Sequence, residues 1–129
     1  MLTPPAYARA NALGARLADG IETAYRAAGL DWRAQRLFCR AGFNYGPDFP
    51  RTAAAARAQA RPDVHQLLRL YMANRGVWES VITAGPTVSF AASADDVEFY
   101  LRNFRAFVEG LVGASSRATM SPRLSPGDT

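Results

Sequence analysis

Few side chains in this 129-residue sequence are of the types that carry covalent or acid–base catalysis. The chain has one cysteine, Cys39, one histidine, His65, and no lysine, because all 15 basic residues are arginine. Arginine stays protonated at every accessible pH, whereas a Schiff base with an aldehyde needs a primary amine that can lose its proton. The sequence therefore offers no side chain that could hold an aldehyde cofactor covalently.

The cysteine and the histidine are both better explained by structure than by catalysis. Cys39 lies on the apolar face of an alternating stretch, and no histidine lies near it in sequence to activate its thiol. His65 lies one position off an apolar helical stripe, without a second ligand or a paired carboxylate beside it in sequence. We assign neither residue a chemical role, and a single cysteine excludes an internal disulfide.

Trp78 and Glu79 are candidates for the wall of a binding cleft. They come shortly before a predicted turn at Gly85-Pro86, where two extended runs meet. In the structural alternative, Trp78 belongs to the core and Glu79 is a solvated or ion-paired surface residue. From the sequence alone we favour that alternative for both.

Composition and charge restrict the class of protein. The net charge is +4, but the arginines are dispersed from Arg9 to Arg123, so a nucleic-acid binder with clustered cations is the weaker interpretation. No apolar run approaches the roughly 18 residues that a membrane span needs, and the N-terminus lacks the pattern of a secretory signal. We expect a single cytoplasmic domain that binds neither nucleic acid nor membranes.

Hydrophobic periodicity predicts three amphipathic helices. Apolar residues recur at helical spacing, and the predicted helices open at Thr3-Pro4, Pro62-Asp63 and Ser93. The expected helices span residues 5–28, 62–75 and 94–111. The alanine-rich residues 53–58 favour a further exposed turn or two of helix within an irregular connection.

Extended runs between these helices predict a small sheet. Residues 35–45 alternate between apolar and polar positions, and residues 77–82 and 87–91 are short runs rich in β-branched residues. The expected fold is α+β, a three-stranded, mostly antiparallel sheet covered by the three helices in the order α-β-α-β-β-α. We expect this domain to occupy residues 1–112, and residues 113–129, rich in Ser, Pro and Gly, to be a disordered tail.

Three stretches carry a resemblance to a known family. They are TPPAYARANALGARLADGIETAYRAAGL, RLFCRAGFNYG with DVHQLLRLYMANRGVWES, and GPTVSFAASADDVEFYLRNFRAF. In order and spacing they resemble the C-terminal small domain of class III aminotransferases that depend on pyridoxal phosphate (PLP). The branch they look most like is that of glutamate-1-semialdehyde aminomutase.

The resemblance implies a partner and a cofactor. Enzymes of this family are homodimers whose preceding large domain binds PLP on a lysine, and that domain has no counterpart here. Because the sequence begins just before the first small-domain helix, we expect a truncated gene, a split gene or a fragment. The resemblance implies that this chain binds no PLP by itself and is inactive alone.

One residue can be carried over from the family. Ornithine-aminotransferase-like members have an arginine for the substrate carboxylate on the closing strand, where this chain has Ser89, as the aminomutase branch does. That branch commonly has a histidine where this chain has Ala92, and an aminomutase glutamate has no counterpart in Thr83-Ala84-Gly85. The resemblance therefore leaves aminomutation and transamination open. It adds Ser89 to Trp78 and Glu79 as candidates for the wall of the substrate cleft.

Two functions remain open from the sequence. In the first, the chain shapes and closes the substrate cleft of a PLP enzyme once it is joined to a PLP-binding large domain. In the second, it is a free-standing protein-interaction module derived from that domain. A small domain without its large partner exposes apolar surface that would mark a binding site.

Overall fold

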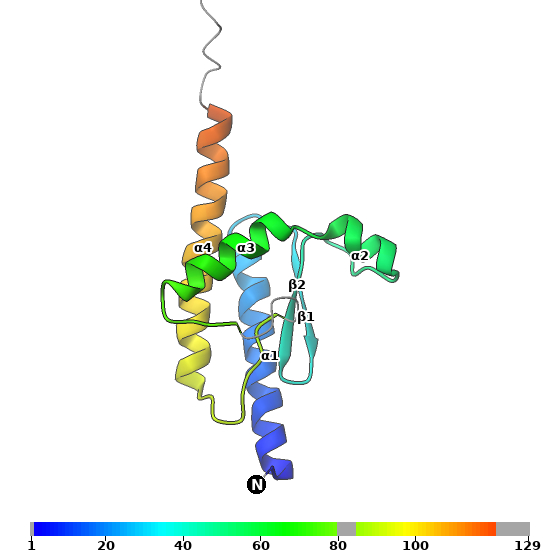
Figure 1. The fold of residues 1–129 in the computed structure, drawn as a ribbon, viewed down its shortest axis with the longest axis vertical. Coiled ribbons are helices and arrows are strands. Elements are labelled where there is room, and N and C mark those ends of the chain that lie inside the picture. Colours follow the sequence, from blue (N-terminus) through cyan, green and yellow to red (C-terminus); the bar gives the residue numbers. More distant parts are fainter. Residues whose placement is uncertain (1, 80–84, 121–129) are drawn as a thin grey trace, which may run out of the picture.

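The computed structural model describes residues 2–79 and 85–120, and in them it has four helices and one two-stranded sheet. In chain order the elements are α1 (Pro4–Ala27), β1 (Arg33–Leu37), β2 (Arg40–Asn44), α2 (Ala53–Gln59), α3 (Pro62–Ala73) and α4 (Ala94–Met120). Helix α1 packs against α4 and against both strands, and α3 packs against α4 (Figure 1). The α+β class expected from the sequence is confirmed.

Helix α1 begins and ends within a residue of the prediction. The Thr3 hydroxyl accepts a hydrogen bond from the amide of Ala6 at 3.4 Å, and proline occupies the first turn. At the other end the amide of Leu30 donates to the carbonyl of Tyr25 at 2.9 Å, across Gly29 with a φ of 75°. This left-handed glycine satisfies a terminal carbonyl and turns the chain toward the sheet.

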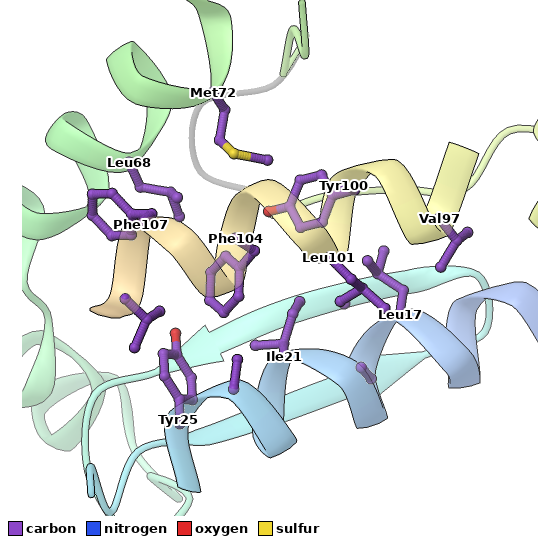
Figure 2. Close-up of a cluster of buried hydrophobic side chains, with 14 of the residues drawn as sticks. Leu17, Ile21, Tyr25, Leu68, Met72, Val97, Tyr100, Leu101, Phe104 and Phe107 are labelled. Atoms are coloured by element: carbon purple, nitrogen blue, oxygen red, sulfur yellow. The ribbon is translucent and has the colours of Figure 1, made fainter. Parts of the chain in front are cut away.

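The core lies where α1, α3 and α4 meet (Figure 2). Gly20 of α1 has no side chain, and a Cβ there would overlap the side chain of Leu101, so the two long helices can approach closely. Phe104 of α4 stacks on Phe43 of β2 with ring centroids 5.8 Å apart, which joins the sheet to the helices. The largest fully buried side chains are Ile21, Tyr25, Leu68, Met72, Leu101, Phe104 and Val108.

The stretch predicted as one strand over residues 35–45 is a hairpin, so that prediction was wrong. Leu37 pairs with Arg40, and the two residues between them form a tight turn in which Phe38 has a φ of 53°. Alternation continues through both strands, and the turn has no Asn-Gly or Gly-Gly signal, so the period alone does not reveal it. Leu37, expected on the apolar face, is 65% exposed.

The third strand and its hairpin were also predicted wrongly for the residues that the structure describes. Residues 77–79 are not a strand, and residues 80–84 lie outside the description. From the second run only Thr87 pairs with the sheet, in a single antiparallel bridge to Arg40. Two hydrogen bonds flank this bridge: the Ala41 amide donates to the Pro86 carbonyl and the Val88 amide to the Cys39 carbonyl, both at 2.9 Å. Pro86 has no amide with which to extend the ladder. The order is therefore α-β-β-α-α-α.

Helices α2 and α3 follow their sequence signals. Helix α2 has no buried residue, as expected from its lack of an apolar stripe, and projects to one side in Figure 1. Helix α3 buries Val64, Leu68 and Met72, one residue from each turn. Its end is closed by the amide of Val77, which donates to the carbonyl of Met72 at 2.9 Å.

Helix α4 starts as predicted but ends later. Ser93 and Asp96 bond reciprocally: the Ser93 amide donates to the Asp96 carboxylate at 2.8 Å, and the Asp96 amide donates to the Ser93 hydroxyl at 3.2 Å. The helix runs to Met120, so residues 113–120 are helical, contrary to the tail predicted for them. Ala114, Arg117 and Ala118 are good helix formers in this stretch. The rest of the predicted tail lies outside the described residues.

Candidate functional site

A cavity of about 340 Å³ lies between the start of α4, the segment after α3 and the middle of α1. Its walls come from residues 76–79, residues 85–88, the first turns of α4 and one leucine of α1. Among the described residues of this wall, the carboxylates are Glu79 and Asp96 and the aromatic rings are Trp78, Phe99 and Tyr100.

Two of the three predicted cleft residues line this cavity. Trp78 and Glu79 both belong to its wall, whereas Ser89 is an exposed residue outside it. The structural alternative for Trp78 was a core position, yet its side chain is 77% exposed. Glu79 was expected at the surface in that alternative, yet only 5% of its side chain is exposed. The structure thus brings Trp78 and Glu79 together and leaves Ser89 apart.

Glu79 is a buried carboxylate facing two side chains of α3. One of its oxygens lies 3.7 Å from Nε2 of His65 and 4.0 Å from Nε of Arg69. His65 and Arg69 are four residues apart and therefore share one face of the helix. Both distances exceed those of a hydrogen bond. Burial raises the pKa of Glu79 above its ordinary value, and the positive charges of His65 and Arg69 oppose that rise.

Two tyrosine hydroxyls belong to the same polar cluster. Burial raises the pKa of Tyr45 and of Tyr100 far above that of a free phenol, and the charge of Glu79 adds to both shifts. Among the described residues, six buried side-chain polar atoms lack a hydrogen-bond partner, and five of them belong to Tyr45, Arg69, Glu79 and Tyr100. We call Glu79, His65, Arg69, Tyr45 and Tyr100 the Glu79 cluster.

Sequence reasoning found only one member of this cluster. The sequence patterns singled out neither Tyr45 nor Tyr100 as a functional residue, and His65 received no role. The one available signal was the spacing of His65 and Arg69, which puts two cationic groups on the same side of a helix. Nothing in the sequence indicated that Glu79 would pack against that side.

The residues at this cavity do not fit PLP. The cofactor is held as a Schiff base on a lysine, and this chain contains no lysine. The described part of the wall presents Glu79 and Asp96 without a basic side chain, which would repel a phosphate group. Within residues 2–79 and 85–120 there is also no group of three side chains suited to a metal ion. No described helix is long and apolar enough to cross a membrane.

The fold has close counterparts among solved structures. Over 85% of its length, this chain superposes on a glutamate-1-semialdehyde aminomutase from Pseudomonas aeruginosa PAO1 with a TM-score of 0.79 and 26% identity. A variant of that protein in complex with PMP gives a TM-score of 0.78 and 26% identity over 82% of the chain. The chain has the fold of one part of a glutamate-1-semialdehyde aminomutase.

That part is small relative to the aminomutase. The match covers 24% of the Pseudomonas chain, and 23% in the complex with PMP. A transaminase with PLP bound shows the same fold, with a TM-score of 0.68 and 22% identity, over 90% of this chain and 26% of its own. No family model and no curated protein matches the sequence. The chain thus spans about a quarter of the aminomutase and transaminase structures that it matches.

Proposed function

We propose that this chain is the C-terminal small domain of a PLP-dependent aminotransferase or aminomutase and is not catalytic alone. Beside a PLP-binding large domain, it would shape and close the substrate cleft. The observation that supports this most is the match to the aminomutase, at 26% identity over 85% of this chain but only 24% of the other. By the same resemblance we propose a homodimer that works in the cytoplasm.

The surface near the cavity supports a missing companion. Trp78, Phe99 and Phe90 are all exposed, and Phe90 meets the exposed ring of Tyr7 edge to face at 4.9 Å. Arg9 fixes this region by donating from its guanidinium to the carbonyls of Phe90 and Ala92, at 3.0 and 2.8 Å. Exposed aromatic side chains held on an ordered surface are typical of interfaces.

In this arrangement Trp78, Glu79 and Ser89 would supply one wall of the substrate cleft. Trp78 and Glu79 line the cavity, and Ser89 lies on the exposed loop between the sheet bridge and α4. The PLP would be held on a lysine of the companion domain, since this chain has no lysine. Closing the two domains over a substrate would exclude water from the reaction.

A reduction experiment tests the absence of catalysis. The purified chain is mixed with PLP, reduced with borohydride, digested and analysed by mass spectrometry. We expect no phosphopyridoxyl group on any side chain, because only a primary amine forms the Schiff base. Acetylation of the N-terminal amine serves as the control for reaction at the chain end. A phosphopyridoxyl adduct on a side chain would contradict the proposal.

Light scattering on the purified chain tests the companion surface and also the alternative of a free-standing module. We expect self-association that decreases in a Trp78→Ser, Phe90→Ser double variant. The matched control is Leu67→Ser with Leu70→Ser, which removes two exposed leucines from α3 outside the cavity wall. If the chain is a monomer and none of these substitutions changes its measured mass, the result argues against a companion domain on this surface.

A further inference from the structure

Glu79 stands out because the described residues around it compensate its burial only in part. Both of its carboxylate oxygens are buried and make no hydrogen bond to any other residue in the described part of the chain. Buried polar groups in folded proteins are nearly always bonded, and an unbonded carboxylate is among the most costly. The segment that carries it, residues 76–79, follows the end of α3 and forms part of the cavity wall.

The start of this segment is attached to the end of α3 by two backbone hydrogen bonds. The Gly76 amide donates to the Ala73 carbonyl at 3.1 Å and the Val77 amide to the Met72 carbonyl at 2.9 Å, and Val77 also packs against the core. Trp78 points its side chain into solvent, whereas Glu79 is buried against His65 and Arg69. The ionisation of Glu79 is therefore in a position to act on how the whole segment packs.

We propose that the packing of residues 76–79 against α3 depends on pH through Glu79, and is tightest when Glu79 carries a proton. The inference concerns the packing of this chain alone and holds whether or not the chain works beside a PLP domain. Because Trp78 and Glu79 both line the cavity, loosening of the segment would alter one wall of it.

The charged and titratable groups around Glu79 set the direction of the pH dependence. From α3 it faces His65 and Arg69, from the chain after β2 Tyr45, and from α4 Tyr100. Arg69 carries a fixed positive charge, but at 4.0 Å it makes no hydrogen bond to the carboxylate. His65 is cationic only when protonated, and Asp96, which lines the same cavity, adds a negative charge. These partners offset the cost of desolvating a carboxylate only in part.

The pKa of Glu79 agrees with this direction, since burial raises it above the ordinary value of 4.5. The packed state then binds a proton more tightly than the loosened state. The contribution of Glu79 to packing is complete below pH 4.5 and is lost as the pH rises through the raised value. Each unit of that rise corresponds to about a tenfold change in the ratio of packed to loosened molecules.

Amide hydrogen exchange measured by NMR on the full chain tests the proposal. The Val77 amide should lose protection, after correction for intrinsic exchange, as Glu79 ionises. The fold-change in the protection of the Val77 amide should equal the one predicted by the pKa of Glu79. That pKa is measured in the same samples from the chemical shift of the Glu79 carboxyl carbon. The matched control is the Leu30 amide, which makes the same type of bond at the end of α1, also at 2.9 Å, and should keep its protection.

Two variants distinguish the effect of ionising Glu79 from the effect of protonating its neighbour His65. Glu79→Gln should keep Val77 protected over the whole pH range, whereas His65→Asn should retain the pH-dependent loss. The same loss in Glu79→Gln, or Val77 protection that stays constant in the unsubstituted chain, would overturn the proposal. If Glu79→Gln fails to fold, the carboxyl titration decides by itself, because a pKa of Glu79 at or below 4.5 contradicts the inference.

Discussion

At the scale of single residues, the two carboxylates of the cavity wall behave in opposite ways. Glu79 is buried without a hydrogen bond, and burial raises its pKa. Asp96 is exposed and accepts hydrogen bonds from the amide and hydroxyl of Ser93, which lower its pKa. Glu79 therefore favours a proton in the folded chain, and Asp96 favours its loss.

Asp96→Asn should destabilise the chain near neutral pH, and the difference should disappear in acid. Because the pKa of Asp96 is lowered from 3.8, its contribution is present above that value and is lost as the pH falls through the lowered one. Urea unfolding of both proteins at several pH values measures this. Asp95→Asn, in the same first turn of α4, is the control for the helix dipole. A difference that persists unchanged into strong acid would contradict the role of Asp96.

Phe104→Ala should cost about 3–5 kcal/mol of unfolding free energy, because it leaves a cavity in a tightly packed region. Phe104 is 1% exposed and meets the rings of Tyr25, Phe43 and Tyr100. Phe99→Ala, on the same helix but 40% exposed, should cost about 1 kcal/mol or less. Urea midpoints measured under identical conditions compare the two, and equal losses would place the core elsewhere.

At the scale of elements, the sequence predicted those features whose signals lie within a few residues of each other. The bounds of α1 follow from Thr3, the prolines and Gly29, because caps act within a few residues. The hairpin in place of one strand could not be found, since Phe38 takes the left-handed turn position without glycine. The Glu79 cluster joins the residue after β2, helices α3 and α4 and the segment after α3, so only the tertiary fold brings it together.

The hairpin turn depends on a glycine of α1. A Cβ at Gly14 would lie 2.6 Å from Cα of Cys39 and 2.7 Å from the Phe38 carbonyl oxygen, both backbone atoms that cannot rotate away. Gly14→Ala should therefore destabilise the chain by about 1–3 kcal/mol. The measurement is the free energy of unfolding in urea.

A second glycine provides the matched control. Gly110 of α4 has open space where a Cβ would lie, so Gly110→Ala should raise stability by about 0.5–1 kcal/mol through helix propensity. If both alanine variants changed the free energy of unfolding in the same direction, the hairpin turn would not depend on the absence of a side chain at Gly14.

At the scale of the whole molecule, the chain folds around one core and has a cavity wall with charged and aromatic side chains. Its core joins three helices and a small sheet, and the fold matches about a quarter of an aminomutase chain. The cavity wall carries carboxylates and aromatic rings, and the chain has no lysine for PLP. Under the proposed function, such a domain would contribute shape and closure to a reaction whose cofactor is held by the large domain.

The most direct test is to isolate the chain from the cells that encode it, with a tag placed at its own gene, and to reduce the preparation with borohydride. Mass spectrometry then locates any phosphopyridoxyl-lysine. We predict that it lies in an accompanying polypeptide or in a longer product of the same gene, and never on a side chain of these 129 residues. A chain that is isolated alone, free of any PLP-bearing sequence, would contradict the account.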